Sequence, residues 1–378
     1  MHKEQLLTLF NTSVEDSLKL TEKDQENQET IERILLNKDI SCECKRIFKN
    51  ICSTLYEFEL YNFNISFEKI KRLEKTFQMF LHSDTVSVEF AKNLSGFCVN
   101  VPNEKRNIIT LGDVLKKVEI EPLSPANLTN MKCPVGIDNY NNPLQIDIAK
   151  LPHLLVCGST GSGKSVCLNS IITSLLLNNE SAALKFIMID PKQVELAPYE
   201  ELTNFLSVPV ITNTYKAATV LWNLCKRMDQ IYMRIKEAGC KNIDEYNSKN
   251  TIKLQRMVVV IDELADLMLK HKKEAEPSII RLAQMGRACG IHLILSTQRP
   301  SREVVTGLLK VNIPAKICFK VPSAVNSRVV LESSGAEKLL GNGDGLFLDG
   351  KSNELIHFQG AMLTTEEIER VVKTVKEF

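Results

Sequence analysis

A glycine-rich stretch followed by a lysine and a hydroxyl residue is the part of this sequence best suited to chemistry. "GSTGSGKS", residues 158–165, fits the pattern G-x-x-x-x-G-K-[ST] at every position. An apolar run precedes it, and the helix-forming run "KSVCLNSIITSLLL" follows. Glycines let backbone N–H groups converge on phosphate oxygens, and the helix N-terminus adds the positive end of its dipole. The context favours a phosphate-binding loop (the P-loop) over an ordinary glycine-rich turn.

The residues of the P-loop are expected to bind ATP together with Mg²⁺. Lys164 is expected to reach the β- and γ-phosphates, and Ser165 to offer its hydroxyl to Mg²⁺. The predicted nucleotide-binding residues are Gly158, Ser159, Thr160, Gly161, Ser162, Gly163, Lys164 and Ser165.

A second acidic element ends an apolar run about 100 residues further on, in "VVVIDE". Asp262 is predicted to hold Mg²⁺ through water, and Glu263 to orient and deprotonate the attacking water. The alternative for this pair is a helix N-cap at the end of a strand. In "STQRP", Gln298 would face the γ-phosphate if its strand lies between the two motif strands. Otherwise it belongs to a turn before Pro300.

Composition sets limits but selects no partner. The chain has 378 residues, 44% of them hydrophobic, and 47 basic against 46 acidic residues give a net charge of +1. This balance neither indicates nor excludes nucleic acid. The 11 cysteines are an odd number and suggest a reduced chain. Cys42 and Cys44 have no partner pair at zinc-like spacing, so we interpret them as plain thiols.

The hydrophobic pattern divides the chain near residue 150. We expect a helical lead-in over residues 1–54 and a small α+β module over 55–150. Over 151–378, short continuous apolar runs alternate with helical stretches, as in a parallel sheet covered on both faces. The expected strands are 153–157, 184–190, 257–262, 291–298 and 315–321. The polar N-terminus and the lack of any 18-residue apolar run predict a cytoplasmic protein.

Several long stretches resemble the motor domain of the FtsK/SpoIIIE family of DNA translocases. They are "LPHLLVCGSTGSGKS", "MIDPKQVELAPYEEL", "VVVIDELADLM", "RLAQMGRACGIHLILSTQRPS", "TGLLKVNIPAKICFKVPSAVNSR" and "VLESSGAEKLLGNGDGLF". The likeness runs from about Asn107 to the C-terminus, and more weakly from about Leu55. It implies a RecA-like P-loop NTPase domain with a mainly parallel sheet, preceded by a small α+β subdomain.

The resemblance also implies a function. Members of this family form hexameric rings that drive double-stranded DNA through a central pore by ATP hydrolysis. The alternatives are a coupling ATPase that delivers DNA, as a single strand, to a conjugative transfer channel, and a type VII-like protein-secretion ATPase. The membrane spans and winged-helix module of larger members have no counterpart in this sequence, so we expect no sequence reading. Residues 1–54 are then the expected docking piece for a loading or anchoring partner.

In such a ring, one arginine could reach the γ-phosphate of the neighbouring subunit. Arg281, Gln284 and Arg287 are three residues apart on one predicted helix that ends at Gly290. We favour Arg287 for this role, with Arg281 and Arg328 as rivals and a surface salt bridge as the alternative.

Basic clusters are the candidates for contacts with DNA phosphates. They comprise Lys270, Lys272 and Lys273 after the second motif, and Arg302 and Lys310 after "STQRP". Such clusters are otherwise solvated faces. The segment "DPK", residues 190–192, either couples the pore to the nucleotide or simply turns the chain.

Overall fold

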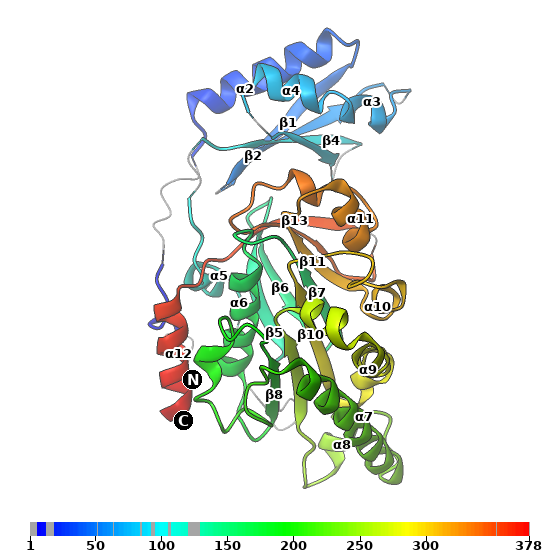
Figure 1. Ribbon diagram of the computed structural model, residues 1–378. Coiled ribbons are helices and arrows are strands. Elements are labelled where there is room, and N and C mark those ends of the chain that lie inside the picture. The colour runs from blue at the N-terminus through cyan, green and yellow to red at the C-terminus, as the bar shows by residue number, and fades with distance from the viewer. Residues whose placement is uncertain are drawn as a thin grey trace. The chain divides into compact units, whose positions relative to one another are not determined.

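A computed structural model describes residues 6–12, 19–50, 52–62, 64–83, 85–91, 95–104, 107–119, 129–352 and 354–377. The chain forms two compact units. The larger unit comprises residues 1–12, 110–136 and 143–378, and the smaller unit comprises residues 13–109 and 137–142. Figure 1 labels their elements.

The smaller unit is an antiparallel sheet with helices packed on one face. Its four described strands lie in the order β1-β2-β4-β3. Ile31 of α2 and Phe77 of α4 are fully buried in one cluster with Tyr56, Phe58 and Phe97 of the sheet. The elements are α2 (Glu22–Leu36), β1 (Cys42–Lys49), β2 (Ser53–Leu60), α3 (Phe67–Lys71), α4 (Glu74–Phe80), β3 (Ser87–Phe90) and β4 (Gly96–Pro102).

The structure departs from the predicted organisation before residue 150. The expected helical lead-in contains α2, but residues 42–49 form β1, whose exposed and half-buried residues carry little strand signal. The strand exists because it pairs with β2, a partner that lies later in the chain. Residues 1–5, 13–18 and 51 of the lead-in lie outside the described residues. The predicted module over 55–150 is divided as well, because β5 (Lys132–Asp138) and β6 (Pro143–Asp147) join the sheet of the larger unit.

The larger unit contains a mainly parallel sheet, which confirms the predicted α/β fold. Its nine described strands lie in the order β6-β5-β13-β12-β11-β7-β10-β9-β8. The five strands from β11 to β8 are parallel and match the five predicted runs, whereas β12 and β13 are antiparallel. The bounds are β7 (His153–Cys157), β8 (Leu184–Ile189), β9 (Arg256–Ile261), β10 (Ile291–Thr297), β11 (Ala315–Phe319), β12 (Asp344–Leu348) and β13 (Leu355–Gly360).

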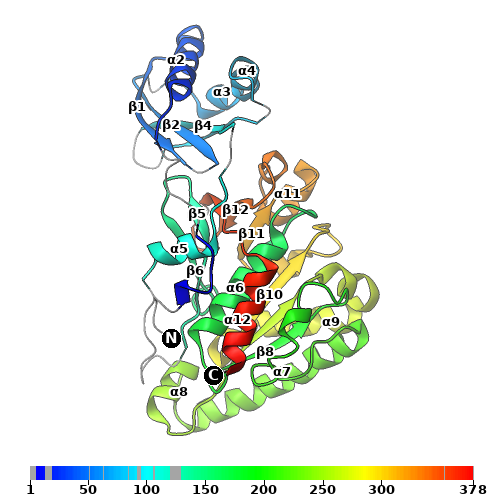
Figure 2. The ribbon, with the colours of Figure 1, turned by 90° about the vertical axis from the view of Figure 1, so that its left-hand side faces the viewer.

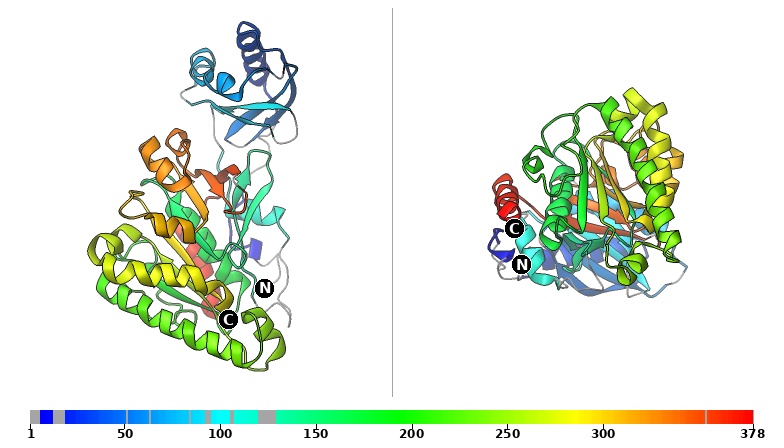
Figure 3. Two further views of the ribbon diagram at one scale, coloured as in Figure 1. Left: turned by 90° about the vertical axis from the view of Figure 1, so that its right-hand side faces the viewer. Right: turned by 90° about the horizontal axis from the view of Figure 1, so that it is seen from below.

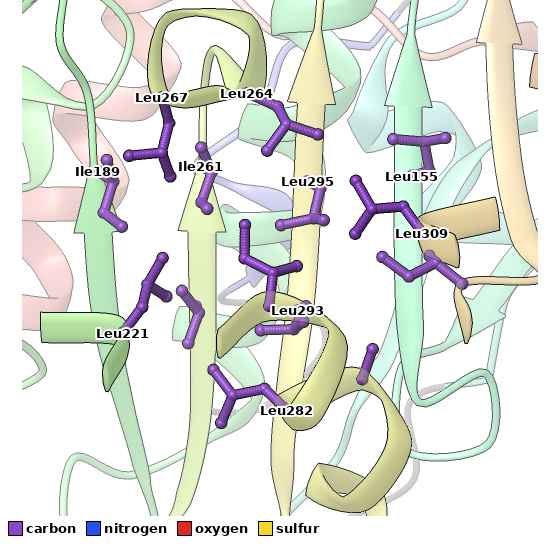
Figure 4. Packing of buried hydrophobic residues seen from close by; sticks show 14 of the residues in the cluster. Leu155, Ile189, Leu221, Ile261, Leu264, Leu267, Leu282, Leu293, Leu295 and Leu309 are labelled. Atoms are coloured by element: carbon purple, nitrogen blue, oxygen red, sulfur yellow. The ribbon is translucent and has the colours of Figure 1, made fainter. Parts of the chain in front are cut away.

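Helices cover both faces of the parallel strands, as the continuous apolar runs require. In Figures 2 and 3, α6 (Lys164–Asn178) and α12 (Thr365–Glu377) lie on one face, and α7 (Thr214–Glu237) and α9 (Leu264–Met285) lie side by side on the other. Figure 4 shows Leu221 and Leu282 of these last two helices packed over Ile189, Ile261 and Leu293. This rigid core holds the strand ends in register.

Shorter elements connect these layers. They are α5 (Leu111–Lys117), the 3₁₀ turn η1 (Ala197–Tyr199), α8 (Ile243–Lys249), η2 (Gly286–Cys289), α10 (Gly307–Asn312), α11 (Ala324–Leu331) and η3 (Ala336–Lys338). None of the described helices combines the length and the apolar character needed to cross a membrane. All 11 cysteines are free thiols. Partial burial raises the pKa of Cys42 to about 11 and that of Cys44 to about 12.

Candidate nucleotide site

The P-loop connects the end of β7 to the start of α6, as the sequence predicts. Gly161 and Gly163 have φ values of 75° and 108°, a region that favours glycine. A Cβ on Gly163 would also lie 2.7 Å from the backbone of Gly343, so a side chain does not fit there. Among the residues that the structure describes, no side chain caps the N-terminus of α6. The first N–H groups of the helix are therefore available to a ligand of the loop.

Lys164 connects the P-loop to the two neighbouring strand ends. Its Nζ donates hydrogen bonds to the Asp262 carbonyl (3.1 Å), the Asp262 carboxylate (3.2 Å) and the Ser296 hydroxyl (2.6 Å). The pKa of Asp262 is raised, mainly because the carboxyl group is buried. The Lys164 ammonium lowers this pKa in part, and the nearby Asp190 and Glu195 carboxylates raise it. The structure thus places the predicted phosphate-binding lysine beside the predicted Mg²⁺ ligand.

Glu263 is held from several directions. Its Oε1 accepts hydrogen bonds from the Thr297 hydroxyl at 2.6 Å and the Ala265 N–H at 3.2 Å. Its Oε2 accepts one from the Gln298 N–H at 3.2 Å. The side chain is only 4% exposed. Glu263 also caps the N-terminus of α9. The sequence offered this capping role as the alternative to a role in chemistry, and the structure is compatible with both.

The strand order brings the separate motifs together. β10 pairs with β7 on one side and with β9 on the other, which is the arrangement that the Gln298 prediction required. The carboxyl ends of β7, β10 and β9 therefore meet at one edge of the sheet. Thr160 donates a hydrogen bond to the Gln298 side chain at 3.1 Å, so this glutamine contacts the P-loop. Its contact with a γ-phosphate stays a prediction.

A turn that site prediction from sequence missed supports the P-loop from the other side. Gly343 N–H donates to the Ser162 carbonyl at 2.8 Å, and Asn342 N–H donates to the Gly161 carbonyl at 3.4 Å. The turn is "GNGDG", and Gly341, Asn342 and Gly343 all have positive φ. The alternating glycines in the sequence indicate a tight turn. The sequence does not indicate that this turn contacts the P-loop, because that contact depends on where β12 lies in the sheet.

Arg287 lies far from the P-loop of its own chain. It belongs to η2, which ends just before the first residue of β10, whereas the P-loop lies at the opposite end of the same strands. The seven residues of β10 span roughly 20 Å. Exposed Gln284 and Arg287 line a polar groove of about 870 Å³ together with Lys132, Lys150, Lys241, Asp147 and Asp244. Of the rival arginines, Arg281 pairs with Asp229 at 2.8 Å and Arg328 is exposed on α11.

Two of the predicted basic segments lie next to each other. The lysine cluster surrounds a kink in α9, where His271 leaves helical geometry at φ −136° and ψ 40°. The Lys272 ammonium donates to the Glu303 carbonyl at 3.4 Å, which joins the kink to the loop that contains Arg302. The cationic groups of Lys272 and Lys310 also lie 3.9 Å and 3.8 Å from the carboxylates of Glu276 and Glu332. Lys270, Lys273 and Arg302 are exposed.

Comparison with known proteins identifies relatives of this chain. The model of the FtsK/SpoIIIE family matches residues 125–302. The chain is 40% identical over 324 residues to DNA translocase SftA of Bacillus subtilis (strain 168), covering 82% of this chain and 33% of the relative. It is 39% identical over 335 residues to DNA translocase FtsK of Tropheryma whipplei, covering 85% and 44%. The chain thus spans between a third and a half of the length of these relatives.

Solved structures show the same fold. The pCW3 conjugation coupling protein TcpA, solved as a monomer with ATPγS, superposes with a TM-score of 0.64 at 26% identity. The match covers 94% of this chain and 99% of that one. The cytoplasmic domain of the type VII secretion ATPase EccC of Thermomonospora curvata gives a TM-score of 0.58 at 23% identity, covering 71% and 34%.

Proposed function

Because this chain belongs to the FtsK/SpoIIIE family, we propose that it is a motor that couples ATP hydrolysis to movement along double-stranded DNA. The observation that supports this most is the meeting of Lys164, Asp262, Glu263 and Gln298 at one edge of the sheet. The names of the relatives supply the DNA substrate. We also propose a cytoplasmic location, because a motor of this kind needs both ATP and DNA.

The residues at this edge fit ATP with Mg²⁺. Ser165 at the start of α6 and the Asp262 carboxylate supply the oxygen ligands that Mg²⁺ prefers. When bound, Mg²⁺ neutralises phosphate charge. The P-loop N–H groups and Lys164 bind and orient the phosphates, and Glu263 takes the proton of the attacking water. The Thr297 hydroxyl and the Gln298 N–H hold that carboxylate in place.

Assembly into a ring, which we propose to be hexameric, would complete the site. Arg287 cannot reach the P-loop of its own chain, because about 20 Å of strand separates them. The same arginine, exposed beside the polar groove, is free to meet the nucleotide of a second copy. We therefore propose that Arg287 stabilises transition-state charge on the γ-phosphate of a neighbouring subunit.

We propose that DNA phosphates contact the exposed cations at the kink of α9 and in the following loop, namely Lys270, Lys273 and Arg302. Phosphate contacts position DNA without reading its bases, and each releases counterions on binding. ATPase activity should therefore be stimulated by unrelated duplexes alike. The apparent affinity should fall with salt at a log–log slope of about −0.9 per phosphate contact. A loading partner that binds residues 1–54 would then set the direction of travel.

A second candidate function is delivery of DNA to a conjugative channel. It is supported by the likeness to the conjugation coupling protein TcpA, which extends over nearly all of both chains. Titrating the ATPase with duplex DNA, single-stranded DNA and peptide at two salt concentrations separates the possibilities. Stimulation by duplex supports the translocase, and stimulation by single strands alone supports the coupling ATPase. Stimulation by peptide alone, or by nothing, would contradict both.

A further inference from the structure

The turn after β8 has a fixed shape and carries an exposed lysine. The fully buried Asp190 carboxylate accepts hydrogen bonds from four backbone N–H groups of the turn, at 2.9 to 3.1 Å. The donors belong to Lys192, Gln193, Val194 and Leu196. Since this network fixes the backbone, it also fixes where the Lys192 side chain begins.

Lys192 reaches from this turn to the predicted general base. Its Nζ lies 3.4 Å from Oε2 of Glu263. The lysine side chain is 42% exposed, whereas the glutamate side chain is 4% exposed. Among the described residues, no other ion pair involves Glu263. The two sides of this pair therefore differ in what can reach them: an anion in solution can approach the lysine but not the glutamate.

Lys192 is not needed to orient Glu263. Thr297, Gln298 and Ala265 already donate hydrogen bonds to both carboxylate oxygens. What the lysine adds is a positive charge at the oxygen that must accept a proton from water. An ammonium ion in contact with that oxygen occupies a position that a water molecule would need in order to donate its proton there. The contact is therefore suited to restraining the base.

We propose that Lys192 restrains Glu263 while no DNA is bound, and that a phosphodiester of bound DNA draws the lysine away and releases the base. The proposal rests on the DNA-stimulated ATPase proposed above. In this proposal Lys192 is a positioning residue, and it couples DNA binding to ATP hydrolysis. The other lysine of the site cannot serve this purpose, because the Lys164 side chain is 2% exposed and pairs with Asp262.

The test compares four proteins for ATP hydrolysis at saturating ATP, with and without saturating duplex DNA. They are the wild type, Lys192→Met, Lys192→Arg and Lys216→Met. Lys216 is an exposed lysine on α7 and matches the charge that is lost. Lys192→Met should raise the DNA-free rate about three- to tenfold, and tenfold is about 1.4 kcal/mol in barrier height. Its rate with DNA should stay within about twofold of wild type.

The conservative and matched variants separate restraint from a structural role. Lys192→Arg should keep the low DNA-free rate, because a cation still faces the carboxylate, and Lys216→Met should behave as wild type. Adding Glu263→Gln to Lys192→Met should abolish the gain. A DNA-free rate that is unchanged or lowered in Lys192→Met overturns the restraint. If DNA fails to stimulate the wild type, the proposed function is wrong. The DNA-free rates of wild type and Lys192→Met would still show whether the Lys192–Glu263 contact restrains hydrolysis.

Discussion

The carboxyl and amino edges of the parallel sheet differ in how their polar side chains are held. At the carboxyl edge, Lys164 and Glu263 are buried and held by several hydrogen bonds each. At the amino edge, Gln284 and Arg287 are exposed beside a polar groove. The first edge has the groups that we propose to bind and hydrolyse a nucleotide, whereas the second has exposed polar and charged side chains. This difference is what the proposed ring requires, since Arg287 would then act on the nucleotide of a neighbouring subunit rather than on that of its own chain.

The largest effect is expected at the carboxyl edge. Glu263→Gln should leave ATP binding intact, because Lys164 and the P-loop are unchanged, while hydrolysis falls roughly 10²- to 10⁴-fold. Lys164→Ala should instead abolish productive nucleotide binding. Nucleotide-binding titrations and steady-state ATPase rates distinguish the two. Near wild-type hydrolysis by Glu263→Gln would remove this residue from the role of base.

The amino edge also contains buried histidines, and these make a prediction about stability. Burial lowers the pKa of His153 to about 4, with a smaller contribution in the same direction from the nearby Arg287 charge. Below about pH 6.5, His153 becomes protonated in the unfolded chain but stays neutral in the folded chain. The free energy of unfolding therefore falls as the pH drops from about 6.5 to about 4. The loss from this residue is at most about 3 kcal/mol.

His153→Asn tests this, because its amide oxygen can still accept the Leu293 N–H that His153 Nδ1 accepts at 3.1 Å. Urea unfolding at several pH values should show a shallower acid-side slope for this variant than for wild type. The matched control is His82→Asn, at an exposed histidine of the smaller unit. Equal slopes for wild type and His153→Asn would show that this histidine titrates alike in both states.

A smaller effect on turnover is expected from Arg287→Ala. ATP binding should stay normal, since the binding groups lie at the other edge, and turnover should fall about 10- to 100-fold, the scale of one charge-assisted hydrogen bond. Mixing this variant with Glu263→Gln should restore part of the activity at hybrid interfaces that have both residues. If intact oligomers of both variants give no restoration, the role moves to Arg281 or Arg328.

The core of the fold and one half of the site were predictable from the sequence. Continuous apolar runs marked β7 to β11, because strands buried on both faces need no polar alternation. The P-loop pattern and "VVVIDE" marked Lys164, Asp262 and Glu263, because their chemistry depends on local spacing. The predictions were weakest where a strand depends on a distant partner. β1 forms only against β2, and β5 and β6 join a sheet whose other strands come later in the chain.

What the sequence determined by itself is therefore a set of local motifs and the strands that carry them. Only the tertiary structure decided which of them meet. Strand order placed β10 between β7 and β9 and brought Gln298 to the P-loop. It also put Arg287 at the opposite edge and directed Lys192 toward Glu263. The physical reason is that hydrogen-bonded pairing between strands distant in sequence sets these neighbours, and no local pattern of residue types records that pairing.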